Sequence, residues 1–110
     1  MEELIFIVQG SAKEPYKITF RKSNNNLSAY CTCPAAYNGQ FCKHRMNIIG
    51  GLTDGIVSGN TLEVEIISTW LSGTDIETAV NEVISAEEQL GIAKRNLASA
   101  KKHLARALSD

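Results

Sequence analysis

Three short segments in the first third of the chain have the hydrophobic patterns of β-strands. Residues 4–8 form an uninterrupted apolar run, and in residues 16–21 apolar and polar side chains alternate strictly. A period of two places successive side chains on opposite faces of a half-buried strand. After a polar turn of serine and asparagine, residues 27–31 can return as a third strand. The pattern predicts a three-stranded antiparallel meander, which is too thin to be stable without further support.

The middle of the chain is predicted to hold two short helices separated by a loop. Apolar residues follow His44 at helix-compatible spacing, and Gly50-Gly51 ends that helix. Residues 52–60 are rich in glycine, serine and aspartate, which is typical of a loop. Residues 61–71 fit a strand by alternation and a helix by apolar positions four residues apart. We favour the helix.

A seven-residue repeat runs through the last third of the chain. Between residues 74 and 108 there is no proline and one glycine, so a single long helix of about 50 Å is expected. Large apolar residues occupy one core position of the heptad and alanines the other, which is the pattern of a coiled coil. The predicted dimer seam consists of Ile76, Ala79, Val83, Ala86, Leu90, Ala93, Leu97, Ala100, Leu104 and Ala107.

The three cysteines and one of the two histidines of the chain lie within fourteen residues. They form the pairs Cys31-x-Cys33 and Cys42-x-His44, and the eight residues between the pairs, which include an Asn-Gly turn dipeptide, are predicted to be a loop. Three thiolates and one imidazole are a standard tetrahedral ligand set for structural zinc. An odd number of cysteines argues against a disulfide framework. We therefore predict that these four side chains bind Zn²⁺.

Three other interpretations of the cysteines carry less weight. Buried cysteines without a metal would leave the clustering with a histidine unexplained. A redox pair of Cys31 and Cys33 would need a thiol of low pKa at a helix N-terminus, whereas the predicted helix follows Cys42. A catalytic zinc needs an open coordination position and a nearby general base. Four protein ligands close the site, and no acidic residue lies between Glu14 and Asp54.

The pattern Cys-x-Cys, spacer, Cys-x-His resembles the SWIM zinc finger. Pro34 directly after the second cysteine, Lys43 between the last two ligands, and the apolar residues behind His44 strengthen the resemblance, which covers residues 16–50. Arg45 stands where family members often have an apolar residue. The resemblance implies that the two Cys/His pairs are the zinc ligands. It also implies a module that binds DNA or proteins and has no catalytic activity.

These observations predict an α+β fold. A small antiparallel meander with a zinc-stabilised finger and a short helix is followed by a long coiled-coil-like C-terminal helix. The expected division is a zinc-finger domain over residues 1–51, a connecting segment over residues 52–73 and the dimerisation helix over residues 74–108.

Composition and charge narrow the class of protein. The 110-residue chain is 44% hydrophobic and 21% charged, which is ordinary for a folded protein and excludes wholesale disorder. Since the longest apolar run is five residues, we expect no transmembrane helix, no membrane partner and a cytoplasmic protein. Residues 1–50 carry a net charge of +3 and residues 51–110 a net charge of −4. A basic face is therefore expected only in the first half.

Two classes of function remain, and neither is enzymatic or needs a small-molecule substrate. The first is a zinc finger that binds nucleic acid, with DNA as the expected partner, through phosphate contacts. The second is a protein–protein adaptor in which zinc is purely structural. The basic residues predicted to contact nucleic acid are Arg21, Lys22, Lys43 and Arg45.

The heptad repeat predicts a homodimer with antiparallel C-terminal helices. In that arrangement each large residue of one helix faces an alanine of the other, about a two-fold axis near Gly91. The first half of the helix is acidic and the second half basic, so antiparallel pairing sets opposite charges side by side. The alternative is a single chain whose helix folds back on its own domain.

Overall fold

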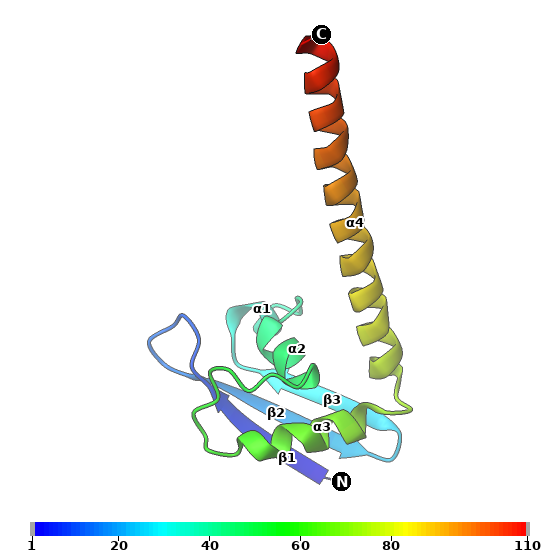
Figure 1. The fold of residues 1–110 in the computed structure, drawn as a ribbon. Helices are drawn as coiled ribbons and strands as arrows, with labels where there is room; N and C mark the ends of the chain where they lie inside the picture. Colours follow the sequence, from blue (N-terminus) through cyan, green and yellow to red (C-terminus); the bar gives the residue numbers. More distant parts are fainter. Residues whose placement is uncertain (1, 110) are drawn as a thin grey trace. The chain divides into compact units, whose positions relative to one another are not determined.

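The computed structural model describes residues 2–109 and contains the expected antiparallel meander. The strands β1 (Glu2–Val8), β2 (Tyr16–Ser23) and β3 (Asn26–Cys31) form one sheet in the order β1-β2-β3 (Figure 1). With the helices described next, this sheet confirms the α+β class predicted from the sequence.

The remaining elements are helical. They are α1 (Pro34–Tyr37), α2 (Lys43–Ile49), the 3₁₀ turn η1 (Thr61–Glu63), α3 (Val64–Leu71) and α4 (Asp75–Ser109). The segment that fitted both a strand and a helix is thus helical, as favoured above. The helix α1 was not expected.

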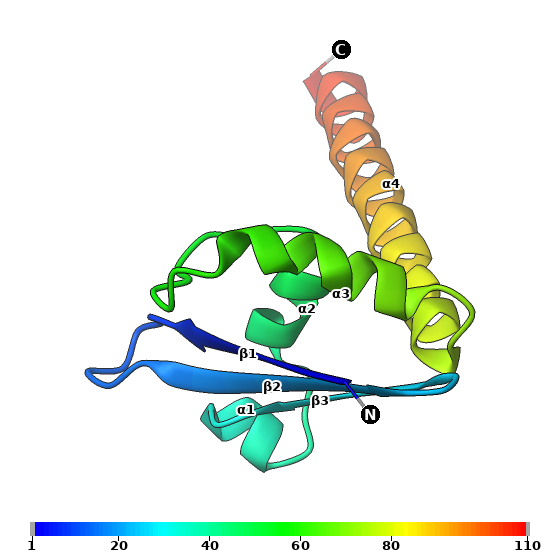
Figure 2. The same ribbon diagram turned by 90° about the horizontal axis from the view of Figure 1, so that it is seen from below.

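The sheet has helices on both sides. Figure 2 shows α2 and α3 over one face, with α1 on the opposite side near the end of β3. The outer edge of β1 is covered by the loop before η1, because Val57 N–H donates to Ile7 O at 2.8 Å and Asn60 Nδ2 donates to Ile5 O at 2.8 Å. The chain therefore pairs the otherwise open edge of β1 with its own loop.

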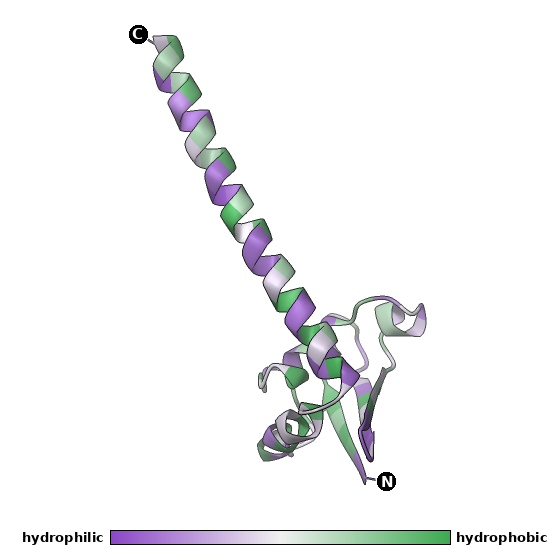
Figure 3. Cartoon of the chain, turned by 90° about the vertical axis from the view of Figure 1, so that its right-hand side faces the viewer, coloured by the Kyte–Doolittle hydropathy of each residue, from purple (hydrophilic) through white to green (hydrophobic). Residues whose placement is uncertain are grey.

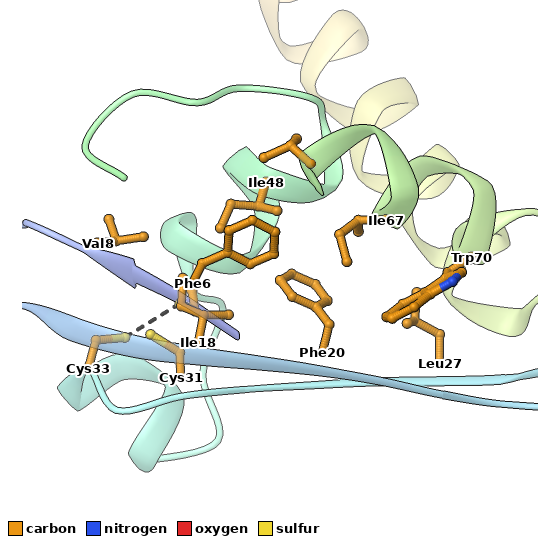
Figure 4. Close-up of a cluster of buried hydrophobic side chains, with 12 residues drawn as sticks. Phe6, Val8, Ile18, Phe20, Leu27, Cys31, Cys33, Ile48, Ile67 and Trp70 are labelled. Atoms are coloured by element: carbon orange, nitrogen blue, oxygen red, sulfur yellow. Dashed lines mark hydrogen bonds between the residues drawn. The ribbon is translucent and has the colours of Figure 1, made fainter. Parts of the chain in front are cut away.

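The hydrophobic core lies between the sheet and the layer of α2 and α3. Phe6, Ile18 and Phe20 from the sheet are fully buried, and the rings of Phe6 and Phe20 pack edge to face at 5.9 Å (Figure 4). From the helical side, α3 adds Ile67 and Trp70. The core thus includes residues of α3, which lies in the segment predicted to connect the zinc-finger domain to the long helix.

The chain divides into two units, the first ending at Glu77 and the second beginning at Thr78. The second unit is the greater part of α4, none of whose described residues is buried. Thr74 Oγ1 accepts a hydrogen bond from Glu77 N–H at 3.4 Å, which satisfies one of the free donors at the start of this helix. Hydrophobic and hydrophilic residues, green and purple in Figure 3, alternate along the length of α4.

Candidate metal centre

Two short chain segments bring the four predicted ligands together. Cys31 is the last residue of β3, and Cys33 is the N-cap of α1. Cys42 is the N-cap of α2, and His44 lies in the first turn of that helix. Each pair thus sits where a regular element begins or ends, so its backbone position is set by the element beside it.

The ligand atoms lie close together, and two of their separations are near those expected around a tetrahedral metal ion. The three sulfur atoms and the His44 ring nitrogen all lie within 4.8 Å of one another. The Sγ atoms of Cys33 and Cys42 are 3.4 Å apart, and Cys42 Sγ is 3.7 Å from His44 Nδ1. Metal–sulfur bonds of about 2.3 Å and metal–nitrogen bonds of about 2.0 Å give ligand separations of roughly 3.5–3.8 Å in a tetrahedron. The four side chains are therefore positioned to bind a metal ion.

The three cysteines are also part of the interior of the first unit. Cys31 is 9% exposed, and Cys33 and Cys42 are 3% exposed, whereas His44 is half-buried. Figure 4 shows Cys31 and Cys33 beside Phe6 and Ile18 of the hydrophobic core. A metal ion held here would therefore join the ends of β3 and α2 directly to the packed core.

Thr32 fixes the geometry of the first cysteine pair. Its N–H donates to Lys17 O at 3.1 Å, and its hydroxyl oxygen accepts a hydrogen bond from Lys17 N–H at 2.9 Å. The chain therefore stays attached to β2 for one residue beyond the end of β3. This attachment holds the residue between the two ligands in place, so both sulfurs are presented on the same side.

The helix α1 corrects the prediction that the eight residues between the cysteine pairs are a loop. Pro34 occupies the first turn, where its missing N–H costs nothing, and Cys33 Sγ accepts a hydrogen bond from Ala36 N–H at 3.4 Å. The predicted turn follows at Gly39, which has a φ of +72°. The helix was missed because cysteine is not a usual N-cap residue and four residues show no periodicity.

The thiols of the first pair differ in acidity, and Cys33 lies at a helix N-terminus, the N-cap of α1, where the sequence predicted no helix. Burial raises the pKa of Cys31 to about 12. Burial acts in the same direction on Cys33, but the Ala36 N–H and the hydrogen bonds from His44 and Cys42 outweigh it and lower the pKa of Cys33 to about 6. The protein environment therefore favours one thiolate and opposes a second until a positive charge is nearby. A bound divalent cation supplies that charge.

Two residues that the sequence did not identify hold His44. The ring of Tyr16 lies 4.9 Å from the imidazole, at an angle of 49°. A Cβ at Gly10 would lie 2.8 Å from Tyr16 Cε2 and 3.2 Å from His44 Nε2. Only glycine allows the loop between β1 and β2 to approach this closely. Tyr16 and Gly10 lie 28 and 34 positions before His44, so no local pattern could reveal these contacts.

The four basic residues predicted to contact nucleic acid lie on two elements. Arg45 is half-buried on α2 and donates to the main-chain oxygens of Ala29 and Gln40, both at 3.1 Å. Arg21 on β2 forms an ion pair with Glu3 at 2.8 Å.

Of the other two basic residues, one again lies on β2 and the other on α2. Lys22 on β2 donates to the main-chain oxygen of Asn24. Lys43 is exposed in the first turn of α2, beside His44. The structure therefore places one pair beside the metal centre and the other near the end of β2.

Most of the predicted dimer seam is open to solvent. Leu90, Leu97 and Leu104 are 55–60% exposed, and the five alanines are exposed as well. Val83 is half-buried. Ile76 differs from the rest because it packs against the hydrophobic core of the first unit.

No protein-family model matches this chain, and neither does any curated protein or solved structure. Among residues 2–109, no helix has both the length and the apolar character required to cross a membrane.

Proposed function

We propose that the first unit is a non-catalytic binding module of the SWIM type, stabilised by zinc. The observation that carries this proposal is the convergence of three buried sulfurs and one imidazole nitrogen within 4.8 Å. Four protein ligands complete a tetrahedron and leave no position for a substrate or an activated water. The role of the metal is therefore to hold the fold together.

The chemistry of the ligands supports zinc among the available metals. Thiolate and imidazole donors in a tetrahedral arrangement suit Zn²⁺, whereas Mg²⁺ and Ca²⁺ prefer oxygen ligands. The strand before Cys31 and the helix that begins after Cys42 are also what the SWIM resemblance implies. Both lines of argument point to the same four residues.

Metal analysis of the purified chain tests the zinc assignment. We expect one zinc per chain, lost in Cys33→Ser and in His44→Ala. The matched control is His103→Ala, because His103 is exposed on α4 and outside the cluster. Protein purified without chelator and free of metal, or a His103→Ala variant that loses zinc as completely as His44→Ala, would contradict the assignment.

For the partner of this module, the local contacts favour a protein over a nucleic acid. Arg45 uses its guanidinium on two carbonyls of its own chain, and Arg21 is paired with Glu3. Phosphate contacts by these side chains would have to compete with those bonds. Beside the metal centre, an apolar hollow of about 220 Å³ is lined by Phe41, Met46 and residues of β3 and α2. Such a hollow suits an apolar side chain of a protein partner.

Nucleic acid is the second candidate, and exposed Lys43 is the observation that favours it. A titration with DNA and with RNA at two salt concentrations separates the candidates, because phosphate contacts make affinity strongly salt-dependent. Under the protein-facing proposal, no salt-sensitive binding is expected at low salt. Binding that is lost in Lys43→Glu and kept in Lys13→Glu would instead establish the nucleic-acid function.

A further inference from the structure

The long helix α4 carries an apolar seam with no partner among the described residues. From Ala79 to Ala107 the seam positions alternate between large aliphatic residues and alanine, and none is buried. A helix gains most of its stability in proteins by packing an amphipathic face, and α4 buries none of its residues. A covered state of this seam is therefore expected.

We propose that α4 pairs antiparallel with α4 of a second copy of the same chain. In antiparallel pairs of helices, the first core position of one heptad faces the second core position of the partner. Here that rule sets Leu90 against Ala93 of the partner subunit, and Val83 against Ala100 of the partner subunit. Every layer then combines one large and one small side chain, so the seam is complementary to itself. This proposal does not depend on the zinc site or on the partner of the first unit.

Charges beside the seam select the antiparallel orientation. Glu87 and Lys94 occupy the same flanking position of successive heptads, and antiparallel pairing sets Glu87 beside Lys94 of the partner subunit, twice in each dimer. Parallel pairing would instead set Glu82 beside Glu87 of the partner subunit, which is repulsive.

The same two residues select one register among its neighbours. Sliding the helices by one heptad, so that Leu90 faces Ala86 of the partner subunit, would put Glu87 against its own copy at the two-fold axis. Sliding them the other way, so that Leu90 faces Ala100 of the partner subunit, would put Lys94 against its own copy. The register centred on Leu90 and Ala93 avoids both like-charge contacts and forms two opposite-charge contacts in their place.

Sedimentation of the full-length zinc-loaded chain tests the seam. We expect a dimer that Leu90→Lys weakens by about a hundredfold or more, since each dimer receives two buried charges. The matched control is Ile92→Lys, because Ile92 is 50% exposed and Leu90 is 55% exposed, but Ile92 lies on the face opposite the seam. A monomeric wild type at high micromolar concentration, or equal effects of the two variants, would overturn the proposal.

Charge reversal tests the orientation and the register. We expect Glu87→Lys alone and Lys94→Glu alone each to weaken the dimer by about tenfold. A mixture of the two variants should form heterodimers, because each flanking pair is then again lysine against glutamate. Neither residue has a charged neighbour three or four positions away in its own helix, so the helix itself should be unaffected. A Glu87→Lys dimer tighter than the wild type would show parallel pairing and overturn the proposal.

Discussion

The first unit and the long helix have similar apolar side chains but treat them in opposite ways. Phe6, Ile18 and Phe20 of the sheet have no exposed surface, whereas Leu90, Leu97 and Leu104 of α4 are more than half exposed. The first unit folds its apolar residues against one another and against three cysteines. The helix cannot do this, because a single straight element has no second layer. Under the two proposals made above, the first unit is completed by a metal ion and the long helix by a second copy of the chain.

The largest expected effect is the loss of the metal. Chelation or Cys33→Ser should unfold the first unit, because zinc contributes about 10–16 kcal/mol in comparable finger peptides. The fluorescence of Trp70, which is buried in the core, should move toward that of exposed tryptophan. Helical circular dichroism from α4 should persist, since this helix makes no use of the metal. Complete loss of helical signal on chelation would show that the two regions are not independent.

Acid should have the same effect as chelation. Thiolates and neutral imidazole bind the metal, so protons compete with it, and metal-dependent stability is present at neutral pH and lost as the pH falls. The raised pKa of Cys31, caused by burial, means that this thiol gives up its proton when the cation binds. Titration calorimetry in two buffers of different ionisation enthalpy should therefore detect proton release. An uptake of metal that is independent of pH between 5 and 8 would contradict the thiolate ligand set.

The next largest effect is expected from truncating a core side chain, which should change the stability of the first unit and not the dimer. Phe20→Ala removes a fully buried ring that packs on Phe6, and should cost about 3–5 kcal/mol in the unfolding free energy of the first unit. Leu97→Ala, at a site that is 56% exposed, should leave that unfolding free energy unchanged and weaken the dimer instead. Denaturant unfolding followed by Trp70 fluorescence, with sedimentation of both variants, measures the two effects. If Leu97→Ala also lowered the unfolding free energy of the first unit, the stability of that unit would depend on the seam of α4, which would contradict this prediction.

The sequence predicted those parts of the molecule that rest on local patterns. Alternation in residues 16–21 identified β2, and the spacing of Cys31, Cys33, Cys42 and His44 identified the metal cluster that the structure brings together. Both signals are local, because side chains alternate with a fixed period in a strand and because the two ligands of each pair are only two residues apart. Both signals can therefore be recognised in the sequence before the fold is known.

The parts that were missed depend on contacts between distant segments. The hydrogen bond from Arg45 to Ala29 O of β3 was not predicted, because nothing near Arg45 along the chain indicates that strand. Residues 61–71 have two periodicities, so the sequence favoured the helix without excluding a strand, and packing of α3 against the sheet confirms the helix. Tertiary context decides such cases.

A smaller effect is expected at the contact that holds His44. Gly10→Ala would place a methyl group 2.8 Å from Tyr16 and 3.2 Å from His44 Nε2, so the Tyr16 ring must shift and the imidazole must move slightly with it. We expect metal affinity to fall by about tenfold, as for other groups that support a metal ligand. The matched control is Gly50→Ala, where the added methyl group meets nothing closer than 3.4 Å. Competition with a chromogenic chelator measures both affinities, and equal affinities would remove Gly10 from the support of the site.

The smallest effect concerns Gly91, the one glycine within α4. Glycine in a helix interior costs about 1 kcal/mol relative to alanine. A Cβ at this position would meet only the side chain of Arg95, at 3.6 Å, which is an ordinary contact. Gly91→Ala should therefore raise the helicity of α4 in dilute solution, measured by circular dichroism, while leaving the zinc content unchanged.

The effect of Gly91→Ala on the dimer tests which face of α4 is in contact in the proposed antiparallel pair. Along the helix Gly91 is close to the proposed two-fold axis, but its heptad position faces away from the seam, as that of Ile92 does, so the dimer should tolerate one methyl group. A weaker dimer with a more stable helix would mean that the face of α4 that carries Gly91 takes part in the contact, and would contradict the proposed seam.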